Sequence, residues 1–173
     1  MYDEPKATVS SVAIKYGLLT GLLSVVFSLI LLLIQQQTDS PWGWISYLIL
    51  ISGIVLAYRE FKRQNRGYMT YGQGLGIGTL IGVVAGVLSA VFIYIYVAFI
   101  DSTILERTRE NQIIEMERRN MSDEQIDQAM ELTAGLFGPG FMAVAAFIGS
   151  IILAFLFSLV IAALMRNSRP DFE

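Results

Sequence analysis

The chain has 173 residues, of which 54% are hydrophobic and 16% are charged, and its formal net charge is −3. It contains neither cysteine nor histidine, which excludes a disulfide, a Cys/His zinc site, a thiolate nucleophile and a histidine base built from this chain alone. The small negative charge gives no general attraction to nucleic acid.

Charged residues are absent from four long stretches of the chain, which cover residues 16–34, 42–58, 67–100 and 132–165. A bilayer core of about 30 Å is crossed by roughly 20 helical residues, and an isolated strand would leave its backbone unpaired in lipid. The pattern therefore predicts an all-α, polytopic membrane protein. We expect a single membrane domain over residues 1–173, with four transmembrane spans at about 13–34, 43–59, 75–100 and 141–165.

Lysine and arginine predict the orientation of these spans. Eight of the twelve basic residues lie at the two ends of the chain and in the connection between the second and third spans, whereas residues 35–41 have none. Because cytoplasmic loops carry the excess of Lys and Arg, both termini are predicted to be cytoplasmic. The interfacial aromatic residues would then be Trp42 and Trp44 on the outer side, and Tyr58, Tyr68 and Tyr71 on the inner side.

Four of these basic residues form a short patch after the second span: Arg59, Lys62, Arg63 and Arg66. We expect the patch to orient the protein and to contact anionic lipid headgroups. A specific lipid or a cytoplasmic partner is the alternative.

Small residues recur every four positions in the third and fourth spans. The third span carries Gly74, Gly78, Gly82, Gly86 and Ala90, and the fourth carries Ala146, Ser150, Ala154, Ser158 and Ala162. The first span offers a shorter series, Gly17, Gly21, Ser24 and Ser28. Lipid supplies no hydrophobic drive between helices, so close approach through small residues supplies the packing energy. The pattern predicts a glycine zipper, which packs helices within one chain or, alternatively, forms a homo-oligomer or docks on another membrane protein.

Residues 101–139 are the only sizeable region outside the predicted spans, and we expect a helical hairpin there. Residues 101–120 are rich in helix formers and are predicted to continue the third span. After a break at Asn120, Ser122 and Gln125 have the spacing of a capping box, and Met121 can pack on Ile126. The segment has nine acidic residues against four arginines, which predicts a solvated acidic face. A divalent cation or a basic partner is the alternative, although no calcium-binding loop is evident.

Two further functions are disfavoured by the residue pattern. The glycines at positions 72, 74, 76 and 78 are spaced by two, and no Gly-Lys-Ser or Gly-Lys-Thr follows, so a phosphate-binding loop is not indicated. The predicted spans contain no Asp, Glu, Lys or Arg apart from Lys15 and Arg59 at their edges, which argues against an ion-coupled transporter.

Several blocks taken together resemble a known family. They are YGLLTGLLS at 16–24, YRE at 58–60, GYMTYGQG at 67–74, Ile100-Asp101, MSDEQI at 121–126 and SLVIAA at 158–163. In this order they resemble domain-of-unknown-function family 4199, over nearly the whole length. The resemblance implies a small four-helix protein of the bacterial inner membrane, and it brings no activity and no catalytic residues.

We therefore expect an interaction or accessory component of the bacterial cytoplasmic membrane that is not an enzyme. No catalytic residue, cofactor or metal site is assigned, and the expected partners are membrane lipids and a possible second copy or membrane protein, with no nucleic acid. An oligomeric channel or carrier for small solutes is the alternative. A membrane enzyme that uses carboxylates of the outer hairpin comes third.

Overall fold

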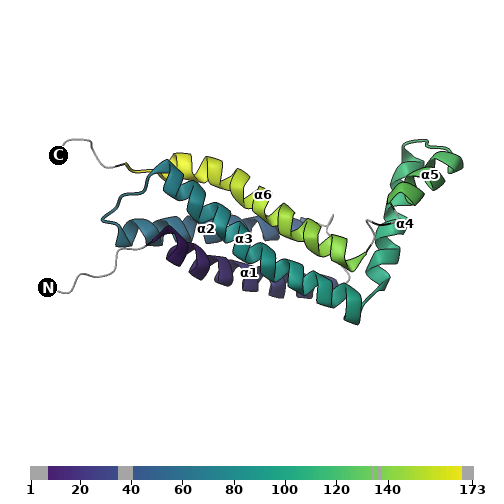
Figure 1. Ribbon diagram of the computed structural model, residues 1–173, viewed down its shortest axis with the longest axis horizontal. Helices are drawn as coiled ribbons and strands as arrows, with labels where there is room; N and C mark the ends of the chain where they lie inside the picture. Colours follow the sequence, from purple (N-terminus) through teal and green to yellow (C-terminus); the bar gives the residue numbers. More distant parts are fainter. Residues whose placement is uncertain (1–7, 35–40, 134, 136–137, 169–173) are drawn as a thin grey trace. The chain divides into compact units, whose positions relative to one another are not determined.

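The computed structural model describes residues 8–34, 41–133, 135 and 138–168, and these residues form an all-α chain (Figure 1). Its long helices are α1 (Val9–Leu33), α2 (Trp44–Gln64), α3 (Tyr71–Ile95) and α6 (Pro139–Met165), with α4 (Thr103–Arg118) and α5 (Asp123–Thr133) between the last two. The prediction of four helices long and apolar enough to cross a membrane is confirmed for α1, α2, α3 with its extension to Ile100, and α6.

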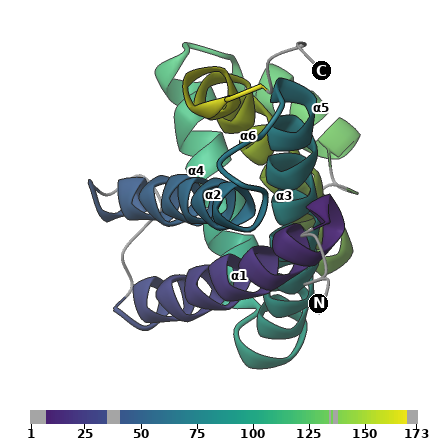
Figure 2. The same cartoon turned by 90° about the vertical axis from the view of Figure 1, so that its left-hand side faces the viewer.

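The chain divides into two compact units. The first, here called the bundle unit, consists of Met1–Ser89 and Phe147–Glu173, and the second, the connecting unit, consists of Ala90–Ala146. Within the bundle unit, α1, α2 and the corresponding parts of α3 and α6 lie side by side (Figures 1 and 2). The connecting unit holds the end of α3, both short helices and the start of α6.

Four of the predicted span boundaries, at about 13, 59, 75 and 141, lie inside the observed helices. α1 begins at Val9 because Thr8 caps it: the Ser11 amide donates to Thr8 Oγ1 (3.1 Å), and the Thr8 amide donates to Ser11 Oγ (3.2 Å). α2 continues through its charged end to Gln64, since Arg, Lys and Glu are good helix formers. In α1 and α2 the charge-free run therefore marks the apolar part of the helix and not its full length.

Successive long helices of the bundle unit alternate in direction. Met69, before α3, and Asn167, after α6, exchange two backbone hydrogen bonds of 2.9 Å. Lys62, near the end of α2, donates from Nζ to the Met165 carbonyl (3.1 Å). These bonds bring the end of α2, the start of α3 and the end of α6 to one end of the bundle unit.

Large apolar side chains lie on the outside of the long helices. Leu19 is 55% exposed on α1, Leu48 59% on α2 and Leu164 80% on α6. The fully buried positions include residues as small as Ala13, Ala57, Ala154 and Ala162, together with Ile54, Ile77 and Ile81. A water-soluble bundle also buries large apolar residues, but it does not expose leucine and isoleucine along every long helix, as this bundle unit does.

The prediction that residues 101–120 continue the third span is wrong. Regular α-helix ends at Ile95, a π-helical turn covers Tyr96–Ile100, and Asp101 is extended (φ −144°, ψ 93°). The Asp101 carboxylate accepts hydrogen bonds from the amide (3.0 Å) and the hydroxyl (2.6 Å) of Thr103. An aspartate that bonds the backbone two residues ahead favours a turn over a continuing helix, so α4 starts afresh at Thr103.

Tyr58, which was predicted to lie at the inner membrane interface, is buried between helices. Its side chain is 0% exposed, and its hydroxyl donates to the Gly74 carbonyl on α3 (2.7 Å). The ring fills the space between helices that glycine leaves open, and the buried hydroxyl finds a backbone acceptor. Trp42 and Trp44, in contrast, are exposed.

Candidate functional site

The predicted small-residue positions of α3 and α6 face each other in the bundle unit. A Cβ atom at Gly74 would lie 2.8 Å from the Ala162 Cβ, and one at Gly82 would lie 2.5 Å from the Ala154 Cβ. Each step of four residues along α3 is matched by four residues back along α6, in the order Gly74–Ala162, Gly78–Ser158, Gly82–Ala154 and Gly86–Ser150. The two helices therefore run antiparallel with a constant register. They are so close that even a Cβ atom at Gly74, Gly78 or Gly82 would collide with α6.

Backbone atoms limit this contact at Gly82. A Cβ there would lie 3.0 Å from the Ser150 carbonyl oxygen and 3.1 Å from the Ile151 Cα. Ser150 Oγ donates to the Gly82 carbonyl across the same interface (3.0 Å). Backbone cannot rotate away as a flexible side chain can, so a larger residue at position 82 must separate the helices.

Polar groups meet around Gly78. The Ser158 Oγ occupies the space that a Cβ of Gly78 would need, and the Tyr58 hydroxyl would lie 3.0 Å from that Cβ. Ser158 is fully buried and donates to the Ala154 carbonyl of its own helix (2.6 Å). The Gly78 Cα hydrogen thus points at the serine oxygen, the arrangement of a Cα–H···O contact between helices.

A similar contact that the sequence analysis did not predict joins α1 and α2. The Thr20 Oγ1 occupies the space that a Cβ of Gly53 would need, and Thr20 is buried. Gly53 is the only glycine within α2, so no repeat marks it in the sequence. On a neighbouring face of α1, which contacts α3, a Cβ at Gly17 would lie 2.7 Å from the Val84 Cβ, and one at Gly21 would lie 2.9 Å from the Ala85 Cα.

The remaining predicted packing positions, Ala90 and Ala146, belong to the connecting unit. Both are half-buried, and Ala146 lines a pocket of that unit. The four-residue step of each stripe continues through them.

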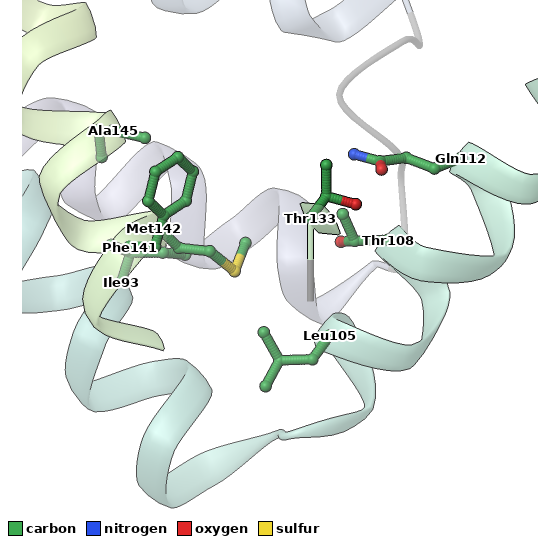
Figure 3. Close-up of a pocket in the computed structure, with 9 residues that line it drawn as sticks. Ile93, Leu105, Thr108, Gln112, Thr133, Phe141, Met142 and Ala145 are labelled. Atoms are coloured by element: carbon green, nitrogen blue, oxygen red, sulfur yellow. The ribbon is translucent and has the colours of Figure 1, made fainter. Parts of the chain in front are cut away.

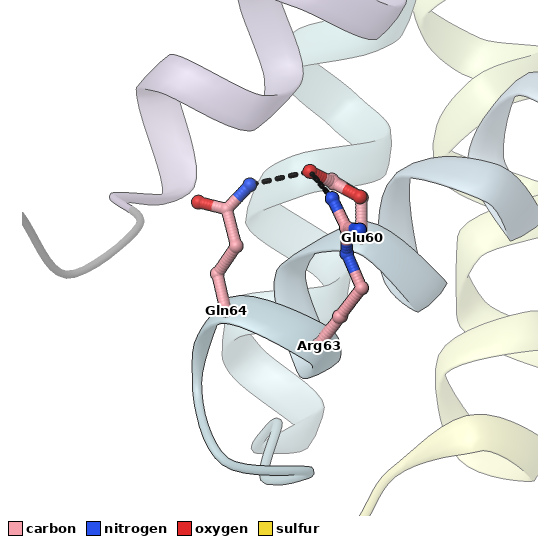
Figure 4. A network of polar contacts seen from close by, with 3 residues as sticks. All are labelled: Glu60, Arg63 and Gln64. Carbon is pink, nitrogen blue, oxygen red and sulfur yellow. Dashed lines mark hydrogen bonds and ion pairs between the residues drawn. The ribbon is translucent and has the colours of Figure 1, made fainter. Parts of the chain in front are cut away.

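The basic residues after the second span differ in their contacts. Lys62 binds the C-terminal carbonyl of α6 at Met165, a position where a cation is also favoured by the helix dipole. Arg63 pairs with Glu60 (2.8 Å), which also accepts a hydrogen bond from Gln64 (Figure 4). Arg59 is exposed, and Arg66 has a left-handed backbone (φ 54°) in the turn between α2 and α3.

In the connecting unit, α5 begins as the capping pattern predicts. The Ser122 amide donates to Gln125 Oε1 (3.0 Å), and the Gln125 amide donates to Ser122 Oγ (3.4 Å). α4 ends where the Met121 amide donates to the Met116 carbonyl (3.2 Å), with Asn120 at φ 58°, a geometry that asparagine tolerates.

The acidic residues of the connecting unit are distributed along its helices. Glu115 pairs with Arg118 (3.7 Å) and Arg119 (3.6 Å). Bonding to Thr103 lowers the pKa of the Asp101 carboxyl, with the positive charge of Arg107 adding to this effect. Among the described residues, no group of three or more acidic side chains could hold a metal ion.

The family comparison covers most of the chain. The family model described as "Protein of unknown function (DUF4199)" matches residues 15–167. No curated protein and no solved structure matches the chain. The match includes α1 from Lys15 onward and all of the other long and short helices, and the chain therefore belongs to this family of unknown function.

Proposed function

We propose that the protein is a multi-pass component of the bacterial cytoplasmic membrane that acts through binding rather than chemistry. In this proposal α1, α2, α3 and α6 cross the bilayer, and both termini are cytoplasmic. The helices α4 and α5 form a hairpin on the opposite side, where they are available to a partner protein.

The observation that carries the membrane proposal is the apolar outer surface of the long helices. Leucines and isoleucines stand outward on the long helices, including Leu22, Leu56 and Leu156, each at least 50% exposed. In water, an apolar surface over the length of four helices would drive aggregation. In lipid the same side chains are solvated by acyl chains, and helices associate through small residues.

The glycine stripe of α3 is proposed to serve packing within one chain. Its positions at Gly74, Gly78, Gly82 and Gly86 are covered by α6, so a second copy would have to displace α6 to use them. This arrangement favours the internal role over homodimerisation through the stripe.

The partner-binding role rests on the sparse packing of the connecting unit. α4 buries none of its side chains, and α5 buries only Ile126 among its described residues. Apolar side chains remain outward on both helices, with Ile114 45% and Leu132 86% exposed. We propose that these exposed side chains are the contact points for a partner, in which they would become buried.

The absence of native cysteine allows a clean test of topology. Glu115→Cys on α4 should react with a membrane-impermeant maleimide in intact cells, whereas Asn65→Cys, after α2, should react only after lysis. The protein should remain in the pellet after a carbonate wash. Reaction of Glu115→Cys only after lysis would reverse the orientation, and recovery in the carbonate supernatant would refute the membrane assignment.

Partner binding is tested separately by the mass of the protein purified from native membranes. We expect a complex heavier than the single chain, which is lost in Leu132→Ser and retained in the neighbouring control Glu131→Ser. A single chain of unchanged mass in all three preparations would contradict the binding role and leave the topology intact.

A further inference from the structure

The connecting unit contains a pocket that no part of the proposed function uses. It has a volume of about 390 Å³ and is lined by residues of α3, α4, α5 and α6, all within Ala90–Ala146. This volume lies at the lower end of the range for small-molecule sites, about 300–1,000 Å³. A pocket of this volume has room for one acyl chain rather than two.

The walls of the pocket differ in polarity (Figure 3). Ile93, Phe141, Met142 and Ala145 provide an apolar wall from the end of α3 and the start of α6, and Leu105 extends it. The facing wall carries the polar side chains of Thr108 and Gln112 on α4 and Thr133 on α5. In Figure 3 the Gln112 carboxamide points toward Thr133.

The hydrogen bonds that Thr108 and Thr133 already make limit which head group the pocket can bind. The Thr108 hydroxyl donates to the Ile104 carbonyl (2.7 Å), and the Thr133 hydroxyl donates to the Ala129 carbonyl (2.8 Å). Both hydroxyl protons are used within their own helices, so the oxygens are left as acceptors, while the Gln112 carboxamide offers donors and an acceptor. A head group with its own hydroxyls satisfies all three side chains.

The lining residues also exclude a charged head group. None of the nine is Asp, Glu, Lys or Arg, and an ionised group that enters without a counter-charge loses hydration without compensation. Phe141 is 45% exposed, and Ala145 is also exposed. The apolar side of the pocket is therefore open on α6, one of the helices proposed to cross the membrane.

We propose that this pocket binds a single-chain amphiphile with a neutral, hydroxyl-bearing head, of the monoacylglycerol class, which enters laterally from the bilayer. The acyl chain lies against Ile93, Phe141 and Met142, and the head bonds to Thr108, Gln112 and Thr133. This inference rests on the membrane part of the proposed function and is independent of its partner-binding part.

The test uses a monoacylglycerol with a photoreactive diazirine in its acyl chain, added to the full chain in phosphatidylcholine vesicles. Mapped crosslinks should concentrate on the lining residues of the connecting unit. Ala145→Phe, which fills the pocket, should lower labelling there at least fivefold, whereas Ala163→Phe, at another exposed alanine of α6, should leave it unchanged. Equal labelling in the two variants, or crosslinks spread evenly over α1, α2 and α6, would refute the site.

The head-group assignment has its own measurement. Gln112→Leu removes one neutral hydrogen bond and should reduce subsaturating labelling about fivefold, whereas Gln128→Leu, at an exposed glutamine of α5, should not. Unlabelled monoacylglycerol should compete better than a fatty-acid anion or phosphatidylglycerol. Equal competition by the fatty-acid anion would refute the neutral head, and equal competition by phosphatidylglycerol, which has both a negative charge and two acyl chains, would refute the neutral, single-chain assignment as a whole. Carbonate extraction of the same variants shows whether any failure reflects loss of the membrane fold instead.

Discussion

In the bundle unit, helices meet through glycine, alanine and serine at distances that leave no room for a larger side chain, as at Gly82 against Ala154. In the connecting unit, the described residues of α4 and α5 bury one side chain, Ile126, and the two helices are organised by local bonds at their ends. The bundle unit should therefore be intolerant of added volume and the connecting unit tolerant of it. Conversely, loss of a capping bond should matter mainly in the connecting unit.

The strongest test of this comparison adds bulk at the α3–α6 contact. Gly82→Leu should reduce the free energy of unfolding by about 3 kcal/mol or more, because its side chain meets the Ser150 and Ile151 backbone. Gly149→Leu is the matched control on α6, where a Cβ would meet nothing within 4 Å. It should be neutral or raise stability by up to about 1 kcal/mol, since leucine favours helix over glycine. Thermal unfolding in detergent measures both, and equal melting temperatures would refute the close contact.

A smaller change at the same interface tests whether the pairing is specific. Gly78→Ala should cost about 1–3 kcal/mol, because its Cβ would lie 2.7 Å from the Ser158 Cβ. Adding Ser158→Gly should restore part of this loss by vacating the space opposite. A double-mutant cycle on thermal unfolding gives the coupling. Additive losses would show that residues 78 and 158 do not share one space.

In the connecting unit the corresponding test removes a cap. Ser122→Ala should cost about 1 kcal/mol, and the loss should appear as faster amide exchange in α5, with the melting temperature of the bundle unit unchanged. Ser102→Ala is the control, because Ser102 precedes α4 without a side-chain capping bond. Slower exchange in α5, or the same change in both variants, would contradict the role of Ser122.

The smallest expected effect is a pH dependence at the start of α4. The pKa of Asp101 is lowered by its bonds to Thr103, so the ionised carboxylate stabilises this turn above the normal aspartate pKa. That stabilisation is lost as the pH falls through the lowered value. The amide resonance of Thr103 should report this transition, and Asp101→Asn should abolish it, whereas Asp127→Asn should not. A midpoint above the usual aspartate range would contradict the assignment.

The sequence by itself determined the number, type and approximate position of the long helices. Each is encoded by its own continuous apolar stretch, because a backbone in lipid must satisfy its hydrogen bonds within the segment. The capping residues Ser122 and Gln125 were predictable for the same reason, since a helix start depends on residues three apart. The four-residue stripes located small residues on helix faces, and the family resemblance followed from blocks along the same chain.

Other features were decided only by the tertiary structure. Tyr58 resembles an interfacial tyrosine in the sequence, but Gly74 and Gly78 on another helix leave the space and the carbonyl that bury it. Gly53 carries no repeat, and its partner Thr20 lies on α1. The register that places Gly78 opposite Ser158 likewise depends on how α3 and α6 pack against each other. These contacts join residues far apart in the chain, and complementary shape, which local sequence does not encode, selects them.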